Sequence, residues 1–400
     1  MSTLKVDGIR SNSASSDAIT LASDGTCTAN ITNNLSNRNK IINGSMVCSQ
    51  RAASFAVTGS TSTYVALDRY RIENSHDGAY TVSQSTTSPD GFANSLKFDI
   101  TTADTSLAAG QFAQIAYRME AQDLQDLAYG TSAAKAIVIS FYVKSNKTGN
   151  YSFNIAQIDN SWKQVSFQYT INSADTWERK TISCAGDTSG VINDDNGRGF
   201  DLSWGLAYGS TYTSGSLRSA WTTYANGDLG PGQAVNLLDS TSNEFFITGI
   251  QIEVDHTGSG VATDFEHKPY AQELALCQRY FYAHSGGAHT VNGSDSSTPN
   301  SVLSTASCQS TSSISVAVPL PVPMRAVPSL YSTVAGSTRY RLNSSGANTN
   351  SGSDPVVWTA GSSHTTVQMD LAGFSGLSAG QAGTVRRYDG TGILGFNAEL

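Results

Sequence analysis

The feature that most constrains this chain is a repeated alternation of apolar and polar residues between residues 36 and 268. Successive side chains of a β-strand point to opposite faces, so a period of two is typical of half-buried strands. The turn Asn146-Lys-Thr-Gly149 separates two such runs and predicts a hairpin between them. The clearest runs are Leu96, Phe98, Ile100; Ile137, Ile139, Phe141, Val143; Tyr151, Phe153, Ile155; Val165, Phe167, Tyr169, Ile171; Phe200, Leu202, Trp204, Leu206; and Phe246, Ile250, Ile252, Val254.

About eight to ten strands at this spacing, without helices of crossover length, predict an all-β fold. We expect an antiparallel, jelly-roll-like β-sandwich. Charged residues are only 14% of the chain, against about 25% in typical soluble domains, which fits neutral polar strand faces. The expected domains are an N-terminal arm at 1–35, the sandwich at 36–268, a connector helix at 269–283 and a smaller C-terminal β domain at 284–400.

Residues 1–35 form an N-terminal arm of short apolar segments separated by Ser, Asn, Asp and Gly. A segment of this length cannot bury a core of its own. It is expected to pack on the next domain or to interleave with the same arm of other copies. The second arrangement is what an attachment and trimerisation region requires. The apolar residues are Leu4, Val6, Ile9, Ile19, Leu21 and Ile31.

Two helices and one unusual strand are predicted outside the alternating runs. A short helix is expected near Met119–Leu127, ending at Gly130. A second is expected over Tyr270–Tyr282, where Leu274, Cys277, Gln278 and Phe281 follow helical spacing after Pro269. Ser313–Val318 alternates again and leads into three prolines within residues 319–323. Because proline donates no backbone hydrogen bond, an edge strand or an extended rim is expected there.

The charge distribution and hydropathy exclude some partners. The net charge is −8 with no Lys/Arg-rich run, whereas a nucleic-acid binder needs a basic face. The sequence contains no stretch of about 18 consecutive apolar residues, so no membrane-spanning helix is predicted. The sequence begins without an apolar run that would serve as a signal peptide, so synthesis in a reducing cytoplasm is expected. The five scattered cysteines are expected to be free thiols, mostly buried.

One acidic cluster could hold a calcium ion, although a turn is the simpler interpretation. Asp194, Asp195 and the nearby Asp201 are oxygen ligands of the kind Ca²⁺ prefers. The closing glutamate of an EF-hand loop is missing. The Asn196-Gly197 step instead favours a turn with solvated acids. No metal site and no cofactor are therefore predicted.

Catalytic motifs are weak in this sequence. Gly376-Leu-Ser378-Ala-Gly380 matches a nucleophile-elbow pattern, but no histidine follows Ser378 to complete a triad of the hydrolase order. We predict a Gly/Ser loop there. A pair of acids for glycoside hydrolysis stays conceivable, because sequence alone gives no distances between carboxylates. Since nothing marks out a pair, we expect no catalytic residues and no enzyme.

The aromatic residues give the more useful functional indication. Trp177 and Trp204 fall in alternating strands and are expected in the core. Trp162, Trp221 and Tyr224 lie in turn and loop segments near Asn and Asp. Exposed rings can stack on the C–H faces of sugars, so these three residues are the predicted glycan-binding face. The alternative is that they only seal the ends of the sandwich.

Several stretches in the same order resemble the tail-fibre and virion-appendage proteins of tailed bacteriophages and prophages, especially marine ones. They run through residues 37–282, and a shorter stretch follows at 318–328. The segments are Met1–Asp7; Asn37–Met46, Gln50-Arg51 and Leu67–Tyr70; Thr176–Thr181 and Gly186–Gly190; Ile247–Glu253, Ala262–His267 and Glu273–Tyr280; and Val318–Pro328.

The resemblance implies a homotrimeric virion structural protein, a tail fibre that contributes to attachment to host-surface glycans. It carries no catalytic residues over to this chain. It implies that the charged residues in these segments are buried or half-buried pairs that fix strand ends and the connector helix: Asp68, Arg69, Glu253, Glu266, Glu273 and Arg279. A passive head fibre, a capsid decoration or collar component, and a polysaccharide depolymerase remain as alternatives.

Overall fold

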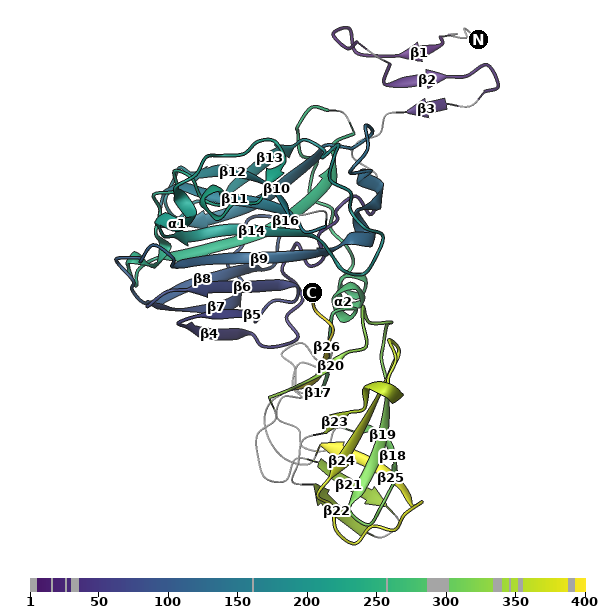
Figure 1. Cartoon of the computed structure of the whole chain (residues 1–400). Coiled ribbons are helices and arrows are strands. Elements are labelled where there is room, and N and C mark those ends of the chain that lie inside the picture. The colour runs from purple at the N-terminus through teal and green to yellow at the C-terminus, as the bar shows by residue number, and fades with distance from the viewer. Residues whose placement is uncertain are drawn as a thin grey trace.

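The computed structural model has a three-part, elongated arrangement (Figure 1). A small β arm stands at one end, a large β-sandwich fills the middle, and a smaller β domain lies at the other end. The residues described are 6–15, 17–25, 27–29, 36–159, 162–256, 258–285, 302–333, 340–344, 347–351, 355–387 and 393–400.

The sandwich consists of two antiparallel sheets, so the predicted all-β antiparallel sandwich is confirmed. One sheet has the strand order β13 (Glu178–Cys184), β10 (Ile137–Ser145), β16 (Glu244–Val254), β8 (Ser95–Thr102), β7 (Ala79–Ser85) and β4 (Ser54–Thr58). The other has the order β15 (Thr222–Thr223), β12 (Lys163–Ile171), β11 (Gly149–Gln157), β14 (Arg198–Tyr208), β9 (Phe112–Glu120), β6 (Tyr70–Ser75) and β5 (Thr61–Tyr64).

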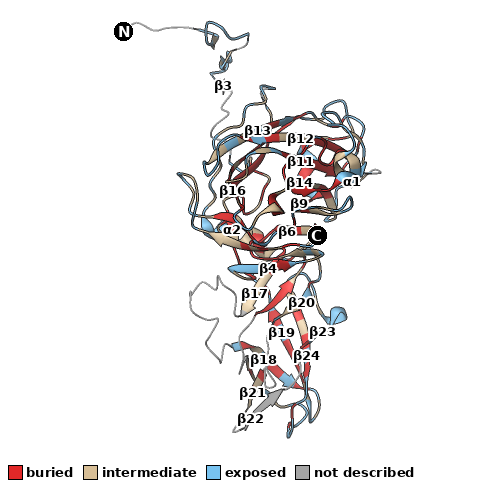
Figure 2. Ribbon diagram, turned by 90° about the vertical axis from the view of Figure 1, so that its left-hand side faces the viewer, coloured by how far each residue is buried: buried red, intermediate tan, exposed pale blue. Residues whose placement is uncertain are grey.

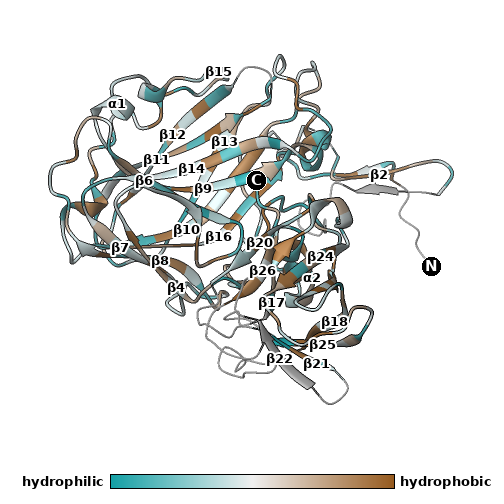
Figure 3. Cartoon of the chain, turned by 60° about the horizontal axis from the view of Figure 1, so that its bottom comes forward, coloured by the Kyte–Doolittle hydropathy of each residue, from teal (hydrophilic) through white to brown (hydrophobic). Residues whose placement is uncertain are grey.

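The apolar positions of the alternating runs meet between the two sheets. Strands of the sandwich alternate between hydrophobic and hydrophilic colours along their length (Figure 3), and their inward residues are buried (Figure 2). Phe141 on β10 packs against Trp204 on β14 with ring centroids 6.0 Å apart. Phe153 on β11 lies 4.9 Å from the same indole. These rings join the two sheets, and Trp204 is a core residue as predicted.

Two expectations about the sandwich strands are wrong. β10 and β11 do not form a hairpin, because β10 pairs with β13 and β16 whereas β11 pairs with β12 and β14. Residues 146–148 therefore cross from one sheet to the other. Trp177 precedes β13 and is only partly buried, with its ring 6.2 Å from Phe246. A local pattern of alternation does not say which strand a segment will pair with, nor which face its ends will occupy.

The arm and the C-terminal part are also built from strands. The arm contains β1 (Gly8–Ile9), β2 (Ile19–Leu21) and β3 (Cys27–Ala29); Leu4 and Ile31 lie outside the described residues. One C-terminal sheet has the order β22 (Ala347–Ser351), β21 (Tyr340–Ser344), β25 (Ala382–Arg387), β18 (Val302–Cys308), β19 (Ser313–Pro319), β24 (Thr366–Ala372) and β23 (Val356–Val357). The other has β17 (Phe281–Ser285), β26 (Leu394–Asn397) and β20 (Ser329–Ser332).

Helices are short. They are η1 (Ala121–Leu127), α1 (Ser210–Thr213), η2 (Asn226–Asp228), η3 (Leu237–Asp239), α2 (Tyr270–Gln278) and η4 (Thr359–Gly361). The first predicted helix is a 3₁₀-helix, and Met119 belongs to β9 instead. The connector helix α2 is shorter than predicted, because Phe281 and Tyr282 begin β17. None of the helices among the described residues is long and apolar enough to cross a membrane.

The strand at Ser313–Val318 exists, but its predicted place at a sheet edge is wrong. β19 lies between β18 and β24, and Pro319 is its last residue. The chain leaves the sheet only at the following prolines, so their missing donors fall beyond the ladder. Ser378 of the Gly/Ser motif lies in the loop between β24 and β25, as expected for a loop.

Four of the six charged residues of the resembling segments, Asp68, Arg69, Glu253 and Arg279, form ion pairs as the resemblance implies, whereas Glu266 and Glu273 accept hydrogen bonds from backbone N–H groups. Asp68 pairs with Arg51 at 3.6 Å, and Arg279 pairs with Glu120 at 2.8 Å. The other four also have partners: Arg69 with Glu399, Glu253 with Arg38, Glu266 with the Asn39 N–H, and Glu273 with the Asn43 N–H. The described cysteine side chains, Cys48, Cys184, Cys277 and Cys308, are free and buried as predicted. Burial and the neighbouring Cys48 raise the pKa of Cys277.

Candidate functional site

The outer face of the seven-stranded sandwich sheet is divided into a covered half and an open half. Residues 209–235 lie over β11 and β12. Amide side chains hold this segment down: Asn154 Nδ2 donates to the Leu229 carbonyl at 2.7 Å, and Gln164 Nε2 donates to the Ala225 carbonyl at 3.1 Å. Outside this cover, Arg118 on β9 and Arg71 and Glu73 on β6 are half-buried, whereas the outward Ala116 and Glu120 on β9 are buried. Arg118 Nη1 also donates to the Leu400 carbonyl at 2.6 Å.

Five charged side chains cross this open half, and we call them the charged row: Arg198, Asp201, Arg118, Glu73 and Arg71. They project outward because their strand neighbours, such as Leu202 on β14 and Ile72 on β6, project into the core. The row alternates in sign across β14, β9 and β6. Each member is between 16% and 29% exposed, so the row is partly desolvated but accessible.

The members of the charged row hold one another in place. Arg198 Nη1 donates to Asp201 at 2.9 Å, and Arg118 Nε lies 3.6 Å from the other oxygen of Asp201. Arg118 also reaches Glu73 at 3.3 Å, and Arg71 Nε donates to Glu73 at 2.8 Å. Burial raises the pKa of Asp201, against the opposing effect of Arg118 and Arg198. Side chains fixed in this way lose little conformational entropy when a ligand binds.

Aromatic side chains border the charged row on the side of the covering segment, and we call them the aromatic edge: Trp162, Tyr224, Tyr212, Tyr208 and Phe112. Trp162 and Tyr224 make an edge-on contact at 5.5 Å. Tyr212 contacts Tyr208 at 5.7 Å and Phe112 at 5.2 Å. Burial, helped by the nearby Tyr212 and Glu73, raises the pKa of Tyr224 to about 12, so its hydroxyl stays protonated at neutral pH.

Hydrogen bonds connect the aromatic edge to the charged row. The Tyr208 hydroxyl donates to Gln114 Oε1 at 2.6 Å, and Gln114 Nε2 donates to Glu73 at 3.0 Å. At the other end, the guanidinium of Arg198 lies 5.8 Å from the centre of the Trp162 ring. The aromatic edge and the charged row are therefore parts of a single surface, which is apolar along one side and offers hydrogen-bonding groups along the other.

The three predicted glycan-binding residues do not all lie together. Trp162 is 43% exposed and neighbours Tyr224 on the aromatic edge. Its φ of +50° lies in the left-handed region, which is uncommon for a non-glycine residue and is often found at functional sites. Trp221 instead packs on Phe200 at 5.8 Å, and its indole N–H donates to the Ala185 carbonyl at 2.8 Å. Trp221 seals the core, which is the alternative that the sequence left open.

The predicted acidic cluster is dispersed. Asp195 Oδ1 accepts from the Gly197 N–H at 2.7 Å within a turn, whereas Asp201 belongs to the charged row. Asp194 is exposed. Across the part of the chain that the structure describes, no group of three His, Cys, Asp or Glu residues is placed to hold a metal ion.

The charged row was not predicted from the sequence. A usable signal was present, because Arg71 and Glu73 occupy alternate positions of one strand and Gln114 and Arg118 occupy outward positions of another. In a chain with few charges, such positions indicate a polar outer face. The sequence alone could not show that β6, β9 and β14 are neighbours, which is what brings the charges together.

Comparisons with known proteins give only distant structural similarity. No family model matches the chain, and no curated protein matches it. Among solved structures, the enzymatically active domain of tailspike protein 4 of bacteriophage CBA120 is 13% identical over 54% of this chain, with a TM-score of 0.29. The matched region spans 21% of that tailspike chain, about a fifth of its length.

Two carbohydrate-binding modules are also similar to part of the chain. A family 4 module is 14% identical, covering 53% of this chain and 98% of the module, with a TM-score of 0.26. The family 11 module of the Clostridium thermocellum cellulase Lic26A-Cel5E is 13% identical, covering 53% and 99%, with a TM-score of 0.26. Scores and identities this low assign no function to this chain.

Proposed function

We propose that this protein binds carbohydrate through the open face of its seven-stranded sheet and serves as a tail-fibre-type subunit of a tailed-phage virion. The observation that carries the binding proposal is that the aromatic edge and the charged row are joined into one surface, through the contact between Arg198 and Trp162 and the hydrogen bonds from Tyr208 to Gln114 and from Gln114 to Glu73. A sugar ring has an apolar C–H face and a rim of hydroxyl groups. Aromatic rings suit the first, and fixed carboxylates and guanidinium groups suit the second.

The virion role is supported by the resemblance of residues 37–282 to phage appendage proteins. The subunit is proposed to be a homotrimer that contacts other virion proteins through residues 1–35. Three sites on one trimer, and several trimers on one particle, would raise a weak affinity for a sugar by avidity. Weak single sites are therefore sufficient for attachment to a host surface.

The binding proposal is tested with the purified protein on a glycan array, followed by titration of the strongest glycan. Trp162→Ala is expected to weaken binding by about 3- to 10-fold, the loss of one aromatic contact. Trp358→Ala is the matched control, because Trp358 is 50% exposed but lies in the C-terminal part. Failure to bind any glycan or host cell would contradict the proposal, as would equal effects of the two variants.

The same preparation tests the proposal that binding occurs without catalysis. Incubation with host capsule or lipopolysaccharide is expected to release no reducing ends, whereas their release would identify a depolymerase. Labelling of the protein on intact particles tests the position on the virion. A signal at the tail tip supports the tail-fibre assignment, and a signal on the capsid face would replace it with a head fibre or decoration protein.

A further inference from the structure

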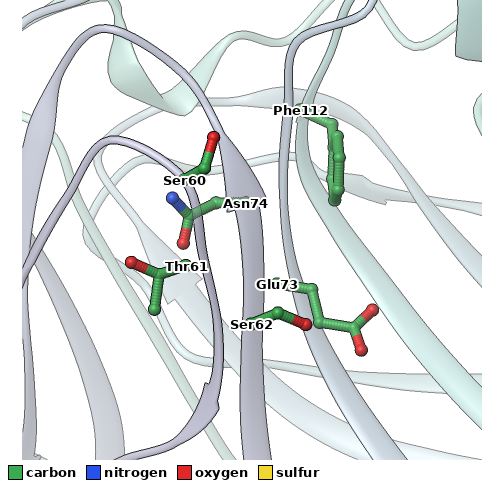
Figure 4. Close-up of a pocket in the computed structure, with 6 residues that line it drawn as sticks. All are labelled: Ser60, Thr61, Ser62, Glu73, Asn74 and Phe112. Atoms are coloured by element: carbon green, nitrogen blue, oxygen red, sulfur yellow. The ribbon is translucent and has the colours of Figure 1, made fainter.

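A pocket opens beside the charged row, on the hairpin of β5 and β6. It has a volume of about 270 Å³ and is lined by Ser60, Thr61, Ser62, Glu73, Asn74 and Phe112. Figure 4 shows Ser60 and Thr61 on one side of the pocket, with Phe112 and the Glu73 carboxylate on the other. The lining thus combines hydroxyl groups, an amide, a carboxylate and one aromatic ring.

The polar groups of the pocket are held by their neighbours. Ser62 Oγ accepts a hydrogen bond from Arg71, and Ser60 Oγ lies 3.2 Å from Ser75 Oγ. Asn74 donates to the Gly59 carbonyl and accepts from the Tyr80 hydroxyl. Glu73 accepts three hydrogen bonds from the charged row and Gln114, out of about four that an ionised carboxylate can accept. A ligand hydroxyl can donate to the acceptor site that remains.

The size of the pocket limits what can enter it. Pockets for drug-sized ligands have volumes of roughly 300–1,000 Å³. A volume of about 270 Å³ lies just below that range, which suits a single sugar ring but not two. The occupant is expected to be one residue of a carbohydrate.

The pocket is continuous with both rows of the proposed site. Glu73 lines the pocket and belongs to the charged row, and Phe112 lines the pocket and belongs to the aromatic edge. Trp162 lies at the opposite end, beside the start of β12, and the strand order from there is β12-β11-β14-β9-β6-β5. Neighbouring strands are about 4.8 Å apart, so β12 and β5 are separated by about 24 Å. This span is much wider than one sugar ring.

From this geometry we infer that the ligand is an oligosaccharide that places one sugar residue in the pocket at Ser62 and Phe112. Its remaining residues lie along the charged row toward Trp162. This inference rests on the proposed function, because it assigns the two ends of the same site. Hydrogen bonds in the pocket give specificity for one kind of sugar. Stacking on Trp162 adds affinity without such specificity, because most sugar rings have a C–H face.

The test is the variant Ser62→Tyr, which places a ring over the pocket from an exposed position of β5 while leaving Glu73 in place. Thr101→Tyr is the matched control, because Thr101 is exposed on the other sheet of the sandwich. The probes are the best array glycan, a series of the same glycan shortened one residue at a time, and free glucose, galactose, mannose and N-acetylglucosamine. Affinities are measured by titration calorimetry, and thermal unfolding checks the folding of each variant.

The wild type is expected to bind the full oligosaccharide more tightly than each shortened form. Ser62→Tyr is expected to weaken binding of the full oligosaccharide about tenfold and to remove its advantage over the form lacking the pocket residue. Thr101→Tyr is expected to behave as the wild type. If Ser62→Tyr does not fold, Phe112→Leu replaces it, with a smaller loss expected.

Three outcomes would overturn the inference. Unchanged affinity in the pocket variants, together with a loss in Trp162→Ala, would remove the pocket subsite and leave the proposed function standing. If the wild type binds a free monosaccharide and the full oligosaccharide with equal affinity, the claim that the ligand extends along the charged row would be wrong. Absence of binding to any probe by the wild type would remove the inference and the proposed function together.

Discussion

Asp68 shows how one buried residue links the stability of this protein to pH. Its side chain is fully buried, accepts from Gln50 Nε2 at 2.9 Å and lies 3.6 Å from Arg51. Burial raises the pKa of Asp68 from 3.8 to about 6, more than Arg51 and Gln50 lower it. The folded protein therefore holds a proton on Asp68 at pH values where the unfolded chain has lost it.

The raised pKa of Asp68 predicts a pH dependence of the free energy of unfolding, and the substitution Asp68→Asn is expected to remove this contribution. Between about pH 4 and pH 6 the folded state binds more protons at this group than the unfolded state, so its contribution to stability falls as pH rises. The contribution is about 3 kcal/mol at most over that window. We expect the free energy of unfolding, measured with urea, to decline less between pH 4 and pH 6 in Asp68→Asn than in the wild type. Identical slopes for the two proteins would refute this assignment.

The aromatic residues show what the sequence can say about single positions. Trp162, Trp204 and Trp221 have the same side chain, but they are exposed, fully buried and packed on the core, respectively. Trp204 was predictable because it lies in an alternating run. The other two lie in loops, where only the packing of distant segments decides whether a ring faces solvent or the sandwich.

At the scale of elements, the C-terminal segment after β26 joins the smaller β domain to the sandwich. Glu399 forms ion pairs with Arg51 and Arg69, and all three side chains are at most 3% exposed. The Arg69 guanidinium lies 3.4 Å from the centre of the Tyr280 ring, just after α2. Arg325 adds hydrogen bonds to the carbonyls of residues 398 and 399. This segment fixes the connector helix between the two bodies.

Glu399→Gln tests the strength of this connection. Removing one partner of a buried ion pair costs about 3–5 kcal/mol, because the other charge is left buried without compensation. The Ala398 amide donates to the Tyr280 carbonyl at 2.8 Å, so its hydrogen exchange reports undocking of the segment. We expect the exchange of this amide to accelerate about 100-fold or more.

The control for Glu399→Gln is the same substitution at Glu244. That carboxylate pairs with Lys97 at 2.6 Å but is 40% exposed. An exposed pair contributes about 0–1 kcal/mol, so exchange at Ala398 is expected to stay as in the wild type. Comparable exchange rates at Ala398 in the two variants would show that the buried pairs do not hold the segment.

At the scale of the whole molecule, the arm is the part whose stability is least explained by one copy of the chain. Val6, Ile9 and Leu21 are each at least 38% exposed on or beside its short strands. Small sheets without a packed face are marginally stable in water. The arm stands apart from the sandwich in Figure 1 and Figure 2. We expect the arms of three copies to pack together, as the proposed homotrimer requires.

Sedimentation equilibrium tests the trimer. The expected mass is about three times the 42.2 kDa of one chain, and Ile9→Asp is expected to shift the equilibrium toward monomer because it places a charge in an apolar contact. Val261→Asp is the control, since Val261 is 70% exposed outside the arm. A stable wild-type monomer would contradict the prediction.

The sequence by itself determined the class of fold. Alternation identified six of the thirteen strands of the two sandwich sheets, and the scarcity of helical spacing excluded a helical protein. These are local properties, because the direction of a side chain in a strand depends only on its position along that strand. The ends of elements were predicted less accurately. Helical spacing extended the predicted helix over Phe281 and Tyr282, but these residues belong to β17 because they pair with β26.

Only the tertiary structure decided which strands are neighbours and which face is open. It separated β10 from β11, placed β19 inside its sheet, and brought Arg71, Arg118 and Asp201 from three distant segments into one row. Strand partners are chosen by contacts far apart in the sequence, through the packing of the whole core. A binding face that crosses several strands depends on those partners, so no local pattern could contain it.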